Sequence, residues 1–135
     1  MNKVFVDTSF IIALVNEKDQ HHTHASELAE LFDGYPLLIT DAVLLEIGNA
    51  LARNFKEQAV EAIEDFLTSD EVEIVRLDAT LFERAFDLYR THKDKRWGMI
   101  DCVSFVVMRE RGIVDVLTND KDFEQAGFAP LMRMS

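Results

Sequence analysis

The chain has 135 residues and a mass of 15.5 kDa, a size that predicts a single domain spanning residues 1–135. Its 48% hydrophobic content predicts a packed core and excludes a disordered chain. No apolar run reaches the roughly 18–20 residues that a membrane-spanning helix needs, and a single cysteine excludes an internal disulfide. We therefore expect a cytoplasmic protein without a membrane partner.

Strand and helix patterns alternate along the whole chain, and no stretch has the composition of a linker. The expected elements are a strand at 3–6, helices at 10–15 and 24–32, a strand at 37–39, a helix from the N-cap Asp41 to about 55, a helix at 57–68, a strand at 72–77, a helix from the N-cap Asp78 to about 92, a helix at 99–111 that Gly112 ends, a strand at 115–118, and a short last strand at 131–134. This order is typical of an α/β fold with a mostly parallel sheet.

Four acidic residues fall where a parallel sheet usually binds its ligands, which is beyond the carboxyl ends of the strands. Asp7 directly follows the first strand, and Asp120 comes two residues after Thr118, the last residue of the strand at 115–118. Asp101 lies at the start of an apolar helix, and Glu46 lies inside the helix after the second strand. Helix capping explains each of the three aspartates equally well when it is taken alone.

Glu46 cannot cap its helix, because it lies five positions past Asp41 and is surrounded by apolar residues. Either it points to solvent, as most glutamates do, or it is buried and must be paired or bind a metal. Asp101 also lies in an almost wholly apolar helix, which is typical of a buried one. Several carboxylates in one cleft repel one another unless a cation compensates them. Their oxygen ligands suit Mg²⁺ or Mn²⁺.

The net charge is −11 and by itself argues against nucleic-acid binding, so any such substrate needs a local basic surface. The segment Lys93, Lys95 and Arg96 is either a phosphate-binding loop near Asp101 or a solvated loop. The further basic candidates are Arg53, Lys56, Arg109 and Arg111.

Three other features resemble sites, and we interpret each as structural. Trp97 is expected to pack rather than to stack on a base. Cys102 is expected to be a small buried residue, since no His and Asp arrangement would activate it. The cluster of His21, His22 and His24 is expected to serve a loop or a helix start, because its spacing suits a metal poorly.

Four motifs in order resemble the PIN-domain family, and among its members the small VapC-type toxins. They are Val4-Phe5-Val6-Asp7-Thr8-Ser9, Asp41-Ala42-Val43-Leu44-Leu45-Glu46, Trp97-Gly98-Met99-Ile100-Asp101-Cys102 and Leu117-Thr118-Asn119-Asp120-Lys121-Asp122-Phe123. The resemblance implies a three-layer α/β/α sandwich and a metal-dependent endoribonuclease that is the toxin of a type II toxin–antitoxin pair. It further implies a homodimer and a cognate antitoxin partner.

By the same resemblance, Asp7, Glu46, Asp101 and Asp120 would be the catalytic cluster that holds Mg²⁺ or Mn²⁺. The hydroxyls of Thr8 and Thr118 would orient these carboxylates. The same fold and acids also suit a house-keeping RNA-processing nuclease, and the small size favours a toxin. Two other classes are a receiver domain or phosphatase, which leaves Glu46 unexplained, and a non-catalytic module whose acids bind a protein partner.

Overall fold

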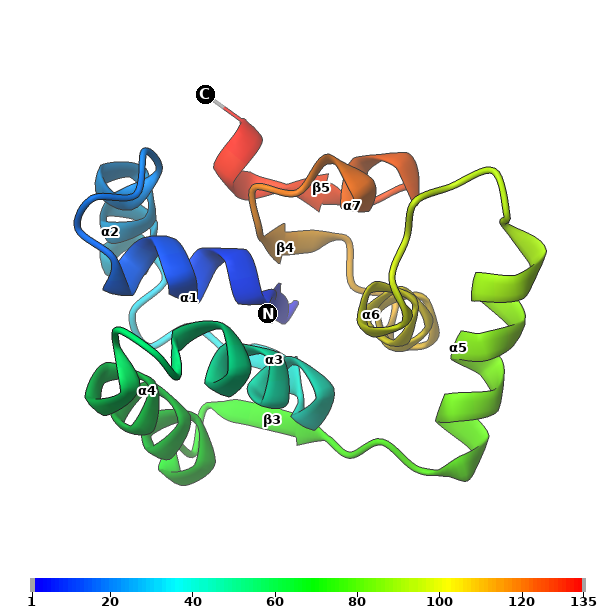
Figure 1. Cartoon of the computed structure of the whole chain (residues 1–135), viewed down its shortest axis with the longest axis horizontal. Helices are drawn as coiled ribbons and strands as arrows, with labels where there is room; N and C mark the ends of the chain where they lie inside the picture. Colours follow the sequence, from blue (N-terminus) through cyan, green and yellow to red (C-terminus); the bar gives the residue numbers. More distant parts are fainter. Residues whose placement is uncertain (1, 135) are drawn as a thin grey trace.

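The computed structural model describes residues 2–134, and within them five strands form one sheet in the order β3-β2-β1-β4-β5 (Figure 1). The strands are β1 (Val4–Val6), β2 (Leu37–Thr40), β3 (Val72–Val75), β4 (Asp115–Leu117) and β5 (Ala129–Pro130). All neighbouring strands pair in parallel, which confirms the predicted sheet.

Helices fill the connections between the strands. They are α1 (Thr8–Val15), α2 (His22–Leu31), α3 (Asp41–Leu51), α4 (Lys56–Thr68), α5 (Ala79–Thr91), α6 (Met99–Arg111) and α7 (Lys121–Gln125), with a 3₁₀ turn η1 (Leu131–Arg133) near the end. The chain moves outward from β1 to β3 and then returns past β1 to β4 and β5. Right-handed crossovers therefore place α1–α4 on one face and α5–α7 on the other. Figure 1 shows the strands between these two groups, so the predicted three-layer sandwich is confirmed.

The strands are apolar along almost their whole length because helices cover both faces of the sheet. Phe5, Leu38 and Val116 are completely buried in its centre. On the face of α5–α7, Phe105 of α6 packs edge-on against Phe123 of α7 with ring centres 4.9 Å apart. This packing fixes the start of α7 relative to α6. Among residues 2–134, no helix is long and apolar enough to cross a membrane.

The start of α3 differs from the prediction. The N-cap is Thr40, whose Oγ1 accepts a hydrogen bond of 3.1 Å from the backbone N–H of Val43. Asp41 instead accepts a hydrogen bond from the N–H of Leu77, and so ties α3 to the segment after β3. The helix also ends at Leu51 rather than near Phe55, which is the N-cap residue of α4. By contrast, Asp78 caps α5 and Gly112 ends α6 in a left-handed conformation, both as predicted.

The carboxyl-terminal end of the sheet also differs. The last strand is β5 at Ala129–Pro130, and the predicted strand at 131–134 is mostly the 3₁₀ turn η1. Pro130 has no N–H to donate, which restricts β5 to a short edge strand. Helix α7 was not predicted from the sequence, because its five residues are too few to give a clear hydrophobic period.

Candidate functional site

The candidate site lies where β1 and β4 end side by side, at the carboxyl edge of the sheet. These strands are neighbours, and the chain order reverses between them, which is where open α/β sheets bind ligands. The backbone N–H of Asp7 bonds to the carbonyl oxygen of Leu117 at 3.1 Å. This bond brings the residue after β1 next to Thr118, which follows β4.

Asp7 is a buried carboxylate, only 5% exposed, and neighbouring hydroxyls hold it in place. Thr118 Oγ1 donates to Asp7 Oδ2 at 2.8 Å, and Ser9 Oγ donates to the same oxygen at 3.2 Å. Asp7 precedes α1, yet its side chain makes no capping hydrogen bond. Asp7 therefore occupies the N-cap position of α1 without a side-chain capping bond, and Thr118 and Ser9 hold its carboxylate instead.

Glu46 reaches the same region from the middle of α3. It is half-buried, and the hydroxyl of Thr8 at the start of α1 donates to its Oε1. Helices α1 and α3 pack against each other, which brings the two side chains together. Glu46 therefore does not point freely into solvent, because its carboxylate accepts a hydrogen bond from a neighbouring helix.

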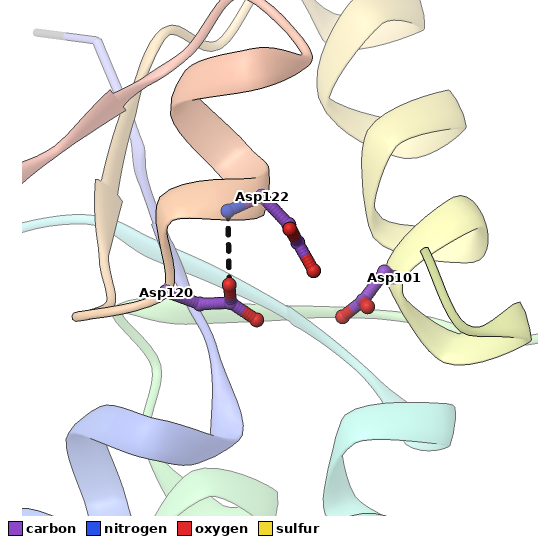
Figure 2. Close-up of side chains that lie close together, drawn as sticks. All are labelled: Asp101, Asp120 and Asp122. Atoms are coloured by element: carbon purple, nitrogen blue, oxygen red, sulfur yellow. Dashed lines mark hydrogen bonds between the residues drawn. The ribbon is translucent and has the colours of Figure 1, made fainter. Parts of the chain in front are cut away.

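Asp101, Asp120 and Asp122 form the tightest acidic group (Figure 2). One carboxylate oxygen from each residue lies within 4.8 Å of the others. Asp101 extends from the first turn of α6, Asp120 lies in the loop before α7, and Asp122 is in α7, and all three are directed into a common space. Among the described residues, Asp7 and Glu46 lie outside this group but close enough for their charges to act on Asp101.

The shifted pKa values are the result of burial and of like charges. Burial raises the pKa of Asp7 to about 6, helped by the Glu46 and Asp120 carboxylates and opposed by the Thr118 hydrogen bond. Burial also raises the pKa of Asp101 to about 7; the Gly98 N–H opposes this, and the charges of Asp7, Asp120 and Glu46 add to it. Burial and neighbouring like charges thus disfavour ionisation of Asp7 and Asp101 near neutral pH.

The other two aspartates bond to helix N-termini: Asp120 is the N-cap of α7, and Asp101 is the third residue of α6, whose N-cap is Gly98. Asp120 Oδ1 accepts the N–H of Asp122 at 2.9 Å, and Asp101 Oδ2 accepts the N–H of Gly98 at 3.1 Å. A carboxylate has several acceptor positions, so capping and metal binding are compatible here.

Sequence reasoning did not select two residues that take part in this arrangement. Asp122 joins the acidic group, and Ser9 contacts Asp7 and accepts the N–H of Asn119 at 3.1 Å. The signal for Asp122 was its position two residues after Asp120 in the same motif, because the first turn of a helix brings such residues to one end.

Basic side chains lie beside Asp120 and Asp122. Lys95 and Arg96 line a cavity of about 560 Å³ together with Lys121, Asp120 and Asp122. Lys93 lines a second cavity next to it.

The other basic candidates are placed elsewhere. Arg109 donates to the carbonyl oxygen of Ala126 at 3.2 Å, and Arg111 pairs with Glu73. Arg111 is also ten residues along α6 from Asp101, which corresponds to about 15 Å of helix. These two arginines therefore do not flank the acids.

The structural interpretations of the remaining features are confirmed. Trp97 is buried and packs edge-on against Phe105 with ring centres 5.0 Å apart. Cys102 is completely buried, and burial raises the pKa of its thiol to about 11, so it is a poor nucleophile. His22 begins α2, and its Nδ1 lies 2.9 Å from the carbonyl oxygen of Ala13.

Comparison with known proteins gives a family match and a relative over almost the whole chain. The model of the family described as "PIN domain" matches residues 4–129. The 23S rRNA-specific endonuclease VapC20 of Mycobacterium tuberculosis, from strains CDC 1551 and H37Rv, is 34% identical over 126 residues, covering 93% of this chain and 95% of the relative.

Solved structures agree with this match. The crystal structure of M. tuberculosis VapC20, described as a sarcin–ricin loop cleaving toxin, superposes with a TM-score of 0.83 at 32% identity and covers 94% of this chain and 97% of that one. DNA-bound VapBC from Salmonella typhimurium has a TM-score of 0.64 at 22% identity, with 93% and 92% covered, and supports the fold alone.

Proposed function

Because this chain belongs to the PIN-domain family, we propose that it is a metal-dependent endoribonuclease that hydrolyses RNA phosphodiester bonds and acts as the toxin of a toxin–antitoxin pair. The observation that carries the proposal is the convergence of Asp7, Glu46, Asp101 and Asp120 from separate elements at the carboxyl edge of the sheet. Acids that are only solvated surface groups are more stable when they lie apart from one another, so solvation alone does not explain this convergence.

The donor set fits a hard divalent cation. It consists of carboxylate oxygens, and Asp101, Asp120 and Asp122 already bring theirs within 4.8 Å of one another. Mg²⁺ and Mn²⁺ prefer such oxygens and are commonly bound by a few carboxylates together with water. Asp7, Glu46, Asp101 and Asp120 are the proposed ligands, with Asp122 as an added one. A cation bound there would supply Lewis-acid activation of water and neutralise charge on the phosphodiester.

The surrounding residues orient these ligands. Thr118 and Ser9 both donate to Oδ2 of Asp7 and so fix the orientation of this carboxylate. Thr8 does the same for Glu46. The raised pKa of Asp101 favours proton uptake at its carboxylate when no cation is bound, and cation binding would release that proton.

Lys95 and Arg96 are the proposed contacts to the RNA backbone, and Lys93 adds to them. Two of them share a cavity with Asp120 and Asp122, so a phosphate bound by these cations would lie next to the acidic group. Local cations are needed for this contact, because the chain as a whole has a net charge of −11 and repels RNA. A guanidinium also binds phosphate through two parallel hydrogen bonds.

We take ribosomal RNA of the large subunit as the first substrate to test, because the curated relative is specific for 23S rRNA. The proposed setting is the cytoplasm, where the protein would form a homodimer and be inhibited by a cognate antitoxin. The acidic cleft favours an antitoxin segment that carries a basic side chain.

The deciding experiment is cleavage of total RNA and of a hairpin with the sarcin–ricin loop, with Mg²⁺, with Mn²⁺ and with chelator. Asp101→Asn should abolish the metal-dependent fragments, while Asp33→Asn, at an exposed site distant from the cluster, should leave them unchanged. Equal cleavage by wild type and Asp101→Asn would contradict the proposal. A folded wild type that neither cleaves RNA nor binds metal would instead favour the non-catalytic binding module.

A further inference from the structure

A second hollow adjoins the acidic site and is lined by rings and cations. It has a volume of about 500 Å³ and lies between the end of α5 and the loop that leads to α6. It is lined by Phe86, Tyr89, Arg90, His92, Lys93, Lys95, Arg96 and Trp97. The nuclease mechanism proposed above uses the cations at its rim but none of its aromatic rings.

The rings differ in exposure, which gives the hollow a rigid wall and an open face. Trp97 is buried against Phe105, and the His92 ring lies 5.1 Å from the indole. Phe86 and Tyr89 are each 44% exposed, so both rings are accessible to a ligand. A flat apolar ligand would therefore find one fixed wall and two accessible rings.

The charges on this hollow favour an anionic ligand. Arg90 pairs with Asp87 and also lies over the Phe86 ring, 5.4 Å from its centre. Within residues 2–134, Lys93 and Arg96 make no ion pair. A second copy of this chain would bring the same cations to a two-fold contact here, where like charges would face each other. A negatively charged ligand has no such conflict.

The hollow adjoins the acidic site. Lys95 and Arg96 line both this hollow and the cavity that contains Asp120 and Asp122. Figure 1 shows the ribbon of the loop from α5 to α6 close to α7, in agreement with the residues that both segments give to that cavity. A polyanion whose phosphate lies at the acids would therefore reach the rings with its neighbouring unit.

We propose that this hollow is a nucleobase subsite, which binds one unpaired base of the RNA next to the cleaved phosphodiester, with the base stacked on Tyr89 and Phe86. The proposal rests on the nuclease function and deepens it. RNA-binding proteins recognise unpaired bases by stacking them on aromatic rings and guanidinium planes. The cations would bind the phosphates on either side of that base, so the hollow would select loops over paired stems.

The test measures binding and cleavage separately, using full-length protein. Binding is followed by fluorescence anisotropy in chelator, with a labelled hairpin that carries the sarcin–ricin loop. A series of the same hairpin has one loop base removed in each member. Tyr89→Leu keeps an apolar side chain but removes the stacking ring, and should weaken binding of the intact hairpin by about 5- to 100-fold.

One abasic hairpin should show the same loss with wild-type protein, and Tyr89→Leu should then cause no further loss. Such non-additivity identifies the base that contacts the ring. Phe82→Leu is the matched control, since Phe82 is an exposed ring (50%) on the same helix but does not line the hollow. It should bind every hairpin as wild type does.

The subsite is overturned if Tyr89→Leu binds the intact hairpin normally, or loses the same factor on every abasic hairpin. It is also overturned if light scattering shows that Tyr89→Leu dissociates a dimer while RNA binding stays intact. Cleavage with Mg²⁺ keeps the two proposals apart. Base-dependent binding without cleavage would support the subsite and contradict the nuclease. Normal cleavage by Tyr89→Leu would support the nuclease and contradict the subsite. If the wild-type protein neither binds nor cleaves the hairpin, both the subsite and the nuclease proposals are overturned.

Discussion

Thr118 donates its hydroxyl hydrogen to Asp7 at 2.8 Å, although 111 residues separate them in the chain. The bond joins the ends of β1 and β4, and both residues are buried. Thr118 Oγ1 also accepts the N–H of Asp120 at 3.1 Å. One hydroxyl therefore sets the positions of two acids of the site.

Thr118→Val tests this role while keeping the shape of the side chain. It should lower the free energy of unfolding by about 1–3 kcal/mol at neutral pH, because the Asp7 carboxylate and the Asp120 N–H both lose a partner. Cleavage should fall as well, since Asp7 would no longer be fixed. Urea denaturation and a cleavage assay measure the two effects. Thr68→Val is the control, because its hydroxyl binds a carbonyl on the exposed surface of α4; an equal effect of both variants would contradict the role.

The raised pKa values predict an unusual dependence of stability on pH in the absence of metal. Asp101 and Asp7 have pKa values of about 7 and about 6, both above their ordinary value of 3.8. The folded state therefore binds more protons than the unfolded state between about pH 4 and pH 7, and stability must fall as pH rises through this window. In chelator, the protein should be more stable at pH 5 than at pH 8.

Asp101→Asn should remove much of this dependence and raise the free energy of unfolding at pH 8 by about 1–3 kcal/mol, a value reduced for the partial solvent access of the group. The exposed Asp33→Asn should leave the pH profile unchanged. Urea denaturation from pH 5 to pH 8 measures both variants. If the profile of Asp101→Asn follows that of wild type, the stability loss has another origin.

Long patterns predicted most of the fold. They also placed Asp7 and Asp120 at one edge, because residues that follow parallel strands meet there, whereas Glu46 and Asp101 were selected as charges in apolar helices. The role of these acids as metal ligands stays a prediction.

Side chains that act across the sheet could not be predicted in the same way. Ser9 contacts Thr118 only because β1 and β4 are neighbours, and the sequence does not state which strands pair. Thr40 and Asp41 are both good caps at adjacent positions, and the hydrogen bond from Leu77 to Asp41 settles the choice. That bond depends on tertiary structure.

Metal binding should stabilise the protein by mass action. At Mg²⁺ concentrations of about 10–100 times the dissociation constant, the gain in unfolding free energy is about 1.4–2.7 kcal/mol, and the melting temperature should rise accordingly. Asp122→Asn should reduce this gain, because Asp122 lies in the tightest acidic group. Asp115→Asn, at the exposed start of β4, should retain the full gain. Thermal melts with and without Mg²⁺ decide the matter, and a full gain in Asp122→Asn would exclude that residue as a ligand.

Arg96 is expected to bind the RNA backbone rather than a particular base. Arg96→Gln should weaken binding to all RNA hairpins by a similar factor and reduce the slope of log affinity against log salt by about 0.7–0.9. Arg53→Gln is the matched control, because Arg53 is exposed beyond the end of α3, and α3 starts at the acidic edge and runs away from it. Anisotropy titrations over a range of salt concentrations measure both slopes. Equal slopes for Arg96→Gln and wild type would mean that Arg96 makes no phosphate contact, and the cations that offset the net charge of −11 would then have to lie elsewhere on the surface.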